Sequence, residues 1–384
     1  MPSLAPFISN VDREVIMATS ILGQNSVPAQ TERLRTLHPG WFATVMGTSI
    51  LAVATYDNPG NQSALLPIAH AIGRALAIIA YVVAAVLFVA YLTRWIKHRD
   101  AAMSDLRHPV LGATYGTLPG GLLVLAVMTS SIGPSWFSTS AVISLVSILA
   151  IVGGGLAVAI SLTFGYVLFT GEPSIAMVNG GWFIPPVVTI ILPMVLVPLM
   201  PHVSPANARL FLMLGYTFYG MGLFLFALVM SMLYYRLVLH PLPHVAMAPS
   251  LWIALGPVGV GVLALLALAH AGAPIFKSAT AIVVQISLIG ASAIWGFGLW
   301  WLATSIALLV RYVRAGKLPY SIGWWAFTFP LGAYTVATLT LARAWNITII
   351  EWFGVMLYFG LIAFWILLAV TTIKAIRSGQ VWMR

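Results

Sequence analysis

The sequence predicts an all-α integral membrane protein with ten transmembrane helices, and three observations carry this prediction. Of the 384 residues, 61% are hydrophobic and only 7% are charged, whereas soluble domains carry about 25% charged residues. The mean hydropathy is +1.00. Uncharged stretches, such as the 19 residues between Arg74 and Arg94 and the 22 between Glu351 and Lys374, are close to the roughly 20 residues of a membrane-spanning helix. They are too continuous for barrel strands, in which polar and apolar residues alternate.

The expected helices follow from dividing the apolar runs at charges and at clusters of Gly, Pro, Asn and Ser. The predicted ranges are 39–56, 65–96, 111–130, 137–170, 181–201, 207–236, 249–270, 278–312, 324–343 and 350–377. Three regions result from this division. Residues 1–37 form a cytosolic arm, residues 38–378 the transmembrane domain, and residues 379–384 a cytosolic tail.

The distribution of basic residues predicts the orientation of these helices. Fourteen Lys and Arg residues fall on the side that holds both termini, and four fall on the other side. The four are Arg74, Arg209, Lys277 and Arg343. By the positive-inside rule, this asymmetry places both termini in the cytoplasm. We therefore expect a multi-pass protein of the cell membrane that is surrounded by lipid.

The odd-numbered predicted helices are shorter, and each contains a residue that disfavours a regular helix. These residues are Gly47, Pro119, Pro186, Pro257 and Pro330, separated by 72, 67, 71 and 73 residues. The near-equal spacing predicts a helical hairpin repeated five times, although prolines are common in membrane helices in any case. A proline inside a helix leaves a carbonyl group without its partner, and lipid cannot satisfy it. The five kinked helices should therefore lie inside, in a quasi-fivefold arrangement around a central pore.

Several residues of these inner helices are candidates for contact with an anion. The five helix N-termini would face the cytoplasmic mouth, where unpaired N–H groups and helix dipoles favour negative charge. The hydroxyls of Thr48, Ser49 and Thr328 could replace part of an anion's hydration shell, or could instead bond to carbonyls of their own helices. The basic residues of the mouth could equally serve only to set the orientation of the helices.

Charged residues at the opposite side of the membrane are few. Arg343 ends a short helix, so it could attract anions at the outer mouth or cap the helix C-terminus. Glu351 is the one acidic candidate near membrane depth, and we expect it to pair with Arg74, Arg209 or Arg343 rather than to relay protons.

Other classes of function lack their signatures. No cysteine is present, so there is no disulfide or thiolate metal site. The net charge of +10 is spread over loops, whereas nucleic-acid binding needs a basic cluster or tract. No common hydrolase, metalloprotease or phosphate-loop motif occurs. We therefore expect no catalytic residues, metal or cofactor. A membrane enzyme or scaffold is the rival class, and polar residues clustered at one membrane depth would support it.

Two motifs resemble a known family. They are His38-Pro39-Gly40-Trp41-Phe42, which leads into Val45-Met46-Gly47-Thr48, and Trp324-Trp325-Ala326-Phe327-Thr328-Phe329-Pro330-Leu331. The chain resembles the tellurite-resistance/dicarboxylate transporter family over about residues 38–377. This family is related to the slow anion channels of plant guard cells. The first motif is similar to the branch of the fungal sulfite exporter and malate permease.

The resemblance implies five hairpins in quasi-fivefold order and a homotrimer of independent pores. It also implies that Phe329 closes the pore and that Gly47 allows close approach in the first helix, whereas Ser49 stands where branch members have glycine. Without the resemblance, Phe329 would be interpreted as a packing aromatic. The implied function is a channel or transporter for small anions, either C4-dicarboxylates such as malate or inorganic anions. Efflux of sulfite or tellurite-type oxyanions is the alternative.

Overall fold

The computed structural model describes residues 30–316 and 318–382, and in this part of the chain the secondary structure is helical, without strands. Five helices have 14–18 residues and are called the short helices: α3 (Ala43–Tyr56), α7 (Thr117–Ile132), α9 (Ile184–Leu199), α11 (Leu255–Ala271) and α14 (Thr328–Trp345). Five are long: α4 (Leu66–Lys97), α8 (Thr139–Thr170), α10 (Pro205–Leu239), α13 (Thr280–Ala315) and α15 (Thr348–Ser378). Most of the predicted cytosolic arm, residues 1–29, and the last two residues of the predicted tail lie outside the described residues.

Eight segments of the described chain are long and apolar enough to cross a membrane, with mean hydropathies between 1.5 and 2.7. They contain α4, α7, α8, α9, α10, α11, α13 and α15. The chain is therefore an all-helical, multi-pass membrane protein. The two other predicted spans, α3 and α14, are not among the eight, so ten spans remain a prediction. One reason is length, because α3 has 14 residues, and another is polarity, because α14 carries four threonines and Arg343.

The short helices lie inside and the long helices outside. Of the spanning windows in α7, α9 and α11, 78–83% of the residues are buried, against 17–33% in the five long helices. Each long helix packs against the short helix that precedes it in the chain. The short helices contact one another in the order α3, α7, α9, α11, α14, and α14 returns to α3. Inner and outer helices therefore alternate along the sequence, as the predicted helix lengths indicated.

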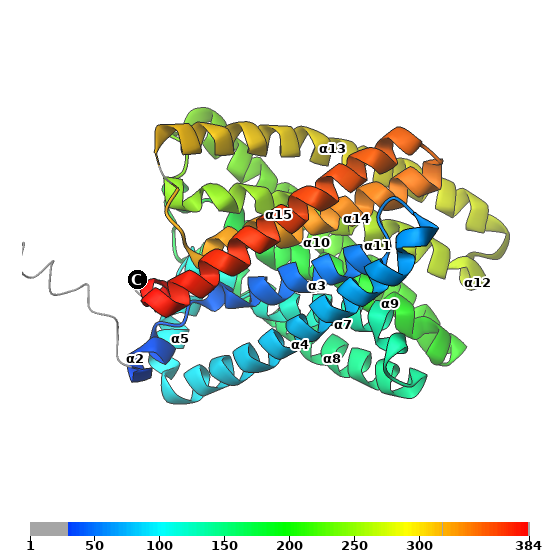
Figure 1. Cartoon of the computed structure of the whole chain (residues 1–384), viewed down its shortest axis with the longest axis horizontal. Coiled ribbons are helices and arrows are strands. Elements are labelled where there is room, and N and C mark those ends of the chain that lie inside the picture. The colour runs from blue at the N-terminus through cyan, green and yellow to red at the C-terminus, as the bar shows by residue number, and fades with distance from the viewer. Residues whose placement is uncertain (1–29, 317, 383–384) are drawn as a thin grey trace, which may run out of the picture.

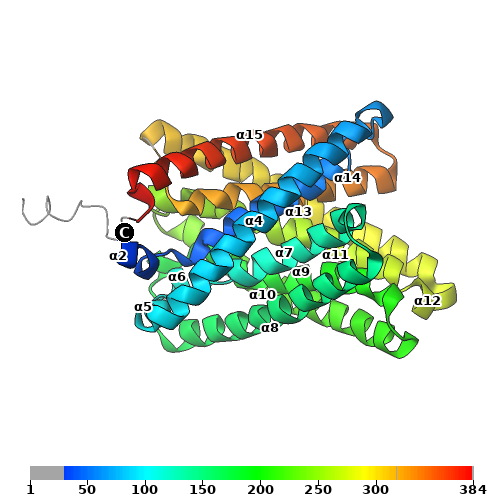
Figure 2. The ribbon, with the colours of Figure 1, turned by 60° about the horizontal axis from the view of Figure 1, so that its bottom comes forward.

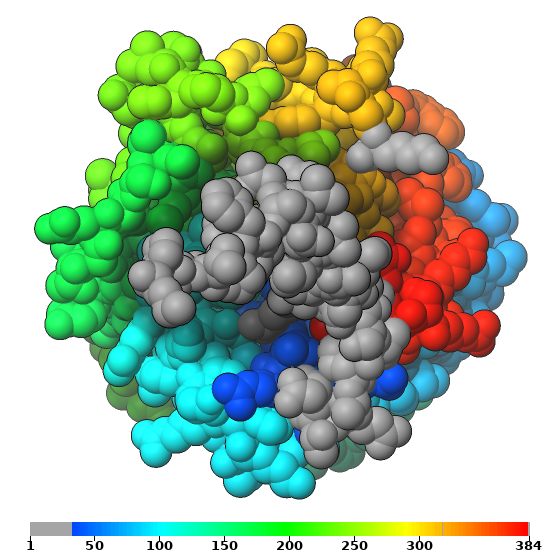
Figure 3. Space-filling model, turned by 90° about the vertical axis from the view of Figure 1, so that its left-hand side faces the viewer, coloured from blue at the N-terminus to red at the C-terminus, as the bar shows by residue number. Residues whose placement is uncertain are grey.

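Helix α2 (Gln30–Arg35) and the C-terminal end of α15 lie at the same end of the bundle, which we call the terminal end (Figure 1). The second view shows the long helices α4, α8 and α15 on the outside of the bundle (Figure 2). Seen from the terminal end, the colours follow the chain order around the periphery of the molecule (Figure 3).

The prolines of the repeat stand in the first turn of their α-helices. Pro119, Pro186, Pro257 and Pro330 are each the third residue of a short α-helix. In the first turn, the N–H that proline lacks would have no partner within the helix, so proline is tolerated there. Gly47 is the fifth residue of α3, and the α-helix continues through it.

In four of the five short-helix units, the regular α-helix begins where a 3₁₀ turn ends. Such turns precede four of the short helices: η2 (Pro39–Phe42), η6 (Gly180–Phe183), η8 (Val245–Ala254) and η10 (Ile322–Phe327). The short helix α6 (Leu111–Thr114) precedes α7. The prolines inside the α-helices are Pro193 and Pro198 of α9, which the repeat analysis did not select.

Glycines allow the short helices to approach one another closely. A Cβ atom on Gly47 would lie 2.1 Å from Oγ1 of Thr328, so α3 and α14 meet at this position. A Cβ atom on Gly259 of α11 would lie 2.4 Å from the carbonyl carbon of Ala333 and 2.5 Å from the amide nitrogen of Tyr334. These atoms belong to the backbone of α14, which cannot move aside as a side chain can.

Gly259→Ala is therefore expected to destabilise the protein by about 1–3 kcal/mol, the cost of overpacking a tight contact. Gly261→Ala on the same helix is the matched control, because no atom lies within 4 Å of the added Cβ. Alanine in a helix is favoured over glycine by up to about 1 kcal/mol, so the control should be neutral or stabilising. Unfolding in detergent measures both. Equal effects of the two substitutions would contradict the close approach of α11 and α14.

Candidate functional site

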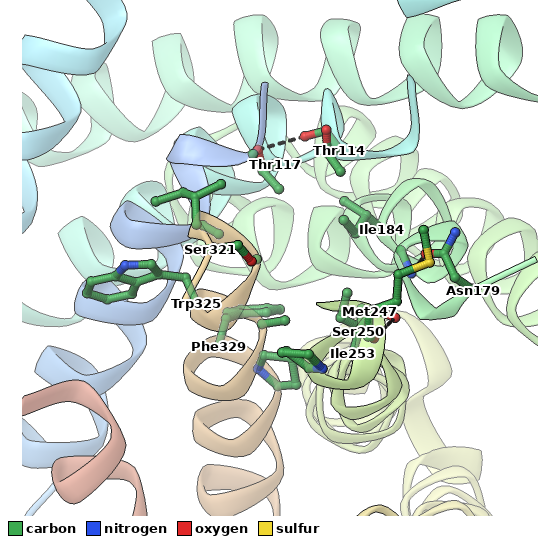
Figure 4. Close-up of a pocket in the computed structure, with 18 of the residues that line it drawn as sticks. Thr114, Thr117, Asn179, Ile184, Met247, Ser250, Ile253, Ser321, Trp325 and Phe329 are labelled. Carbon is green, nitrogen blue, oxygen red and sulfur yellow. Dashed lines mark hydrogen bonds between the residues drawn. The ribbon is translucent and has the colours of Figure 1, made fainter. Parts of the chain in front are cut away.

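A cavity of about 230 Å³ lies where the five short helices begin, among their first residues and the segments that precede them. Each of the five helices or its leading segment contributes to the wall. The lining includes Gly40 and Met46 from the first unit, Thr114 and Thr117 from the second, Asn179 and Val187 from the third, Ser250 and Ile253 from the fourth, and Trp325 and Phe329 from the fifth. The labelled side chains surround the cavity from different elements (Figure 4).

The wall of this cavity is mostly apolar, and its hydroxyl and amide groups are mainly engaged with the backbone. The side chain of Asn179 accepts a hydrogen bond from the Gly181 N–H and donates one to the Met177 carbonyl, both 2.7 Å long. The Thr117 hydroxyl donates to the carbonyls of Thr114 (2.8 Å) and Pro39 (3.0 Å). Among the described lining residues there is no Asp, Glu, Lys or Arg. The features that favour an anion are therefore the N–H groups and dipoles of the converging helix starts.

Similar side-chain caps stabilise several of the 3₁₀ turns that precede the short helices. His38 Nδ1 accepts a hydrogen bond from the Gly40 N–H (2.9 Å), and His244 Nδ1 accepts one from the Ala246 N–H (3.3 Å). Asn179 occupies the corresponding place before η6. The sequence signal that reveals this relation is Gly40-Trp41-Phe42, repeated as Gly181-Trp182-Phe183, and the search for helix breakers missed it. His38 thus caps the turn η2 at its N-terminus.

Phe329 is part of the cavity wall and is 5% exposed. Its ring faces Gly256 of α11, where an added Cβ would lie 3.5 Å from Cε1 of the ring and 3.5 Å from the Val187 side chain. Phe329 belongs to a buried apolar cluster with residues from all five short helices, among them Met46, Val124 and Val260. Phe329 therefore belongs both to the cavity wall and to the apolar cluster that joins the five short helices.

The three hydroxyl candidates do not line this cavity. The Thr48 hydroxyl donates to the Thr44 carbonyl (2.7 Å) and accepts a hydrogen bond from Trp365 Nε1 (3.1 Å). The Thr328 hydroxyl donates to the Trp325 carbonyl (2.8 Å). Ser49 is fully buried, and its hydroxyl has no hydrogen-bond partner. For Thr48 and Thr328, the geometry favours the alternative of bonding to the helix backbone.

Arg343 lies at the C-terminal end of α14, away from the cavity. Its Nη2 lies 3.3 Å from the Asn58 carbonyl and 3.5 Å from the Asp57 carbonyl, at the C-terminus of α3. Its Nε lies 3.8 Å from Glu351 Oε1, so the expected pairing of Glu351 with one of three arginines is confirmed. A cation at a helix C-terminus is favourable. The contacts therefore favour helix capping over attraction of anions, but Arg343 caps the C-terminus of α3 and not that of its own helix.

Arg343→Gln is expected to lower the free energy of unfolding by at most about 1 kcal/mol, since the ion pair is partly exposed, and to leave anion flux within about twofold of the parent. Flux and thermal unfolding of the reconstituted variant check this expectation at low and high ionic strength. A flux that falls only at low ionic strength would instead identify Arg343 as an anion-attracting charge, because salt screens exposed charges.

The five short helices begin around a cavity, and the long apolar helices surround them. This arrangement defines the class of membrane channels and transporters. Residues 36–373 match the family model described as voltage-dependent anion channel. The chain belongs to this family, which confirms the resemblance that its motifs indicated, and its activity is membrane transport of anions.

Three relatives cover nearly the whole chain. Two uncharacterised transporters of Methanocaldococcus jannaschii are 35% and 33% identical to it, over 90% and 91% of this chain and 94% and 97% of theirs. A sulfite efflux pump of Arthroderma otae is 26% identical over 88% of this chain and 90% of its own.

Proposed function

We propose that the protein moves small anions across the cell membrane through a passage enclosed by its five short helices, and that Phe329 closes this passage. The observation that carries the proposal is the cavity itself. Four of the short helices and the η8 turn that precedes α11 meet around it, and Phe329 is part of its wall. A large apolar ring in a narrow passage strips water from an ion and offers no compensating partner, which raises the barrier to conduction.

The proposed architecture is ten transmembrane helices, arranged as five hairpins in quasi-fivefold order around the passage. The closed series of contacts among the short helices supports it, as does the packing of each long helix on the short helix before it. We propose that both termini are cytoplasmic, because most of the basic residues fall on that side of the predicted topology. A homotrimer follows from the family resemblance.

The proposed substrates are C4-dicarboxylates such as malate, or inorganic anions. Sulfite or a tellurite-type oxyanion is the second candidate. The observation that favours sulfite is the similarity to fungal proteins named sulfite efflux pumps, at 26% identity over 88% of this chain.

Flux assays in proteoliposomes test the proposal with chloride, nitrate, sulfite and malate, each with and without a pH gradient. We expect saturable or conductive flux of at least one of these anions above that of protein-free liposomes. Flux that a pH gradient accelerates would identify a proton-coupled carrier, and flux that depends only on the anion gradient and voltage would identify a channel. Correctly folded protein that moves none of the four anions would contradict the proposed function.

A further inference from the structure

Arg236 is a buried cation without a carboxylate partner. It lies near the end of α10, and 5% of its surface is exposed. Its Nη1 donates a hydrogen bond to the Val178 carbonyl, and its buried Nε has no hydrogen-bond partner. Among the described residues it makes no ion pair. Val178 directly precedes Asn179, which lines the cavity, so the guanidinium is bonded to the backbone next to the cavity wall.

Arg94 shows how a similarly placed arginine is neutralised. It lies near the end of α4, and its Nη2 and Nε donate to the Arg35 carbonyl at 3.1 and 3.2 Å, in the segment before the first leading turn. Its Nη2 also lies 2.6 Å from Asp105 Oδ2. Both arginines thus hold the backbone that leads into a short helix. Only Arg94 has its charge balanced.

Holding such a carbonyl does not require a charge. In the fourth hairpin, the Tyr312 hydroxyl of α13 donates to the Pro243 carbonyl (2.7 Å), just before His244 and η8. In the first, the Tyr91 hydroxyl of α4 donates to the His38 carbonyl (2.7 Å). A neutral donor would therefore suffice at position 236, whereas burying an unpaired guanidinium is costly. Anchoring alone does not account for the positive charge.

We propose that the uncompensated charge of Arg236 sets the anion selectivity of the cavity, by raising the local anion concentration and opposing cations. The proposal rests on the transport function proposed above. Because Arg236 is not among the residues that line the cavity, it acts through its field and not by contact with the ion. A buried charge acts in a low dielectric and is screened weakly by salt, so its effect persists at high ionic strength.

The test compares Arg236→Gln and Arg236→Met, which remove the charge, with Arg236→Lys, which retains it. The readouts are the anion concentration that gives half-maximal flux and the permeability of anions relative to cations. A unit charge about 10 Å from an ion changes its occupancy about tenfold at an effective dielectric of about 20. We therefore expect the neutral variants to raise the half-maximal concentration about tenfold and to lower selectivity, at low and at high ionic strength. The Lys variant should remain within about twofold of the parent.

Arg311→Gln is the matched control, because Arg311 lies near the end of the neighbouring long helix and is exposed. Its effect should vanish at high ionic strength. The proposal would be overturned if the neutral variants kept the half-maximal concentration and the selectivity of the parent. It would also be overturned if the Lys variant lost as much selectivity as the neutral variants. Failure of both neutral variants to fold, with the Lys variant folded, would assign the charge to stability and also overturn it. A parent protein without anion flux would instead refute the proposed function.

Discussion

Phe329→Ala is expected to increase anion flux per folded protein by about 10- to 1000-fold. The ring is part of the cavity wall and faces Gly256, which has no side chain to project toward it. Removing the ring removes a dehydration barrier of several kcal/mol, and each 1.4 kcal/mol corresponds to a factor of about ten in rate. The measurement is flux or current in proteoliposomes, divided by the amount of monodisperse, folded protein.

Phe327→Ala is the matched control for this substitution. Phe327 is 2% exposed, but its ring stacks on Phe364 of α15 with centroids 4.9 Å apart, so it packs toward an outer helix. Loss of this packing should cost about 3–5 kcal/mol of stability without raising flux. If well-folded Phe329→Ala conducts no more than the parent and only loses stability, Phe329 is a packing aromatic. The residue that closes the passage would then lie elsewhere.

Asp105→Asn is expected to lower the free energy of unfolding by about 3–5 kcal/mol, because it leaves the Arg94 charge buried without its partner. The two side chains are 1% and 9% exposed, and Arg94 Nη2 lies 2.6 Å from Asp105 Oδ2. The Arg94 Nη1 also donates to the Tyr115 hydroxyl (2.9 Å), which itself donates to the Ala102 carbonyl (2.9 Å). This network joins α4, α5 (Arg99–Leu106) and the segment that leads to α7. Unfolding in detergent measures the loss.

Asp100→Asn is the control, since Asp100 also lies on α5 and its ion pair with Arg35 is exposed. The Asp100 and Arg35 side chains lie 2.8 Å apart and are 64% and 50% exposed, so the loss should be at most about 1 kcal/mol. The double variant Arg94→Met/Asp105→Leu should recover much of the loss, because apolar residues can replace a buried ion pair. An Asp105→Asn loss no larger than that of Asp100→Asn would contradict a stabilising role for the buried pair.

The repeat in the sequence predicted the alternation of helices, but it did not separate each short α-helix from the turn that precedes it. Pro186 and Pro257 marked two of the short helices correctly, yet both stand in the first turn. The reason is that a 3₁₀ turn and the following α-helix form one apolar run in the sequence. Nothing in the hydropathy distinguishes the two, because both are buried. The repeated Gly-Trp-Phe of residues 40–42 and 181–183 marks the 3₁₀ turns directly.

The site residues were predictable only in part. Gly256 and Phe329 come together because α11 and α14 are neighbours, a relation that no local pattern encodes. Thr48 and Thr328 were chosen for their hydroxyl groups, but they bond to their own backbone. Arg236 was counted only among the basic residues that set orientation. Its burial and lack of a carboxylate follow from the packing of α10 against α9 and η6.

The sequence by itself determined the membrane class, the alternation of short and long helices and the one-sided distribution of basic residues. These properties follow from composition and length, because a bilayer accepts only helices or closed barrels, and the apolar runs are too long and continuous for barrel strands. Only the tertiary structure decided which faces of the short helices line the cavity and which pack against neighbours. A helix buried on every side is apolar on every side, so its sequence carries no amphipathic pattern that separates the two faces.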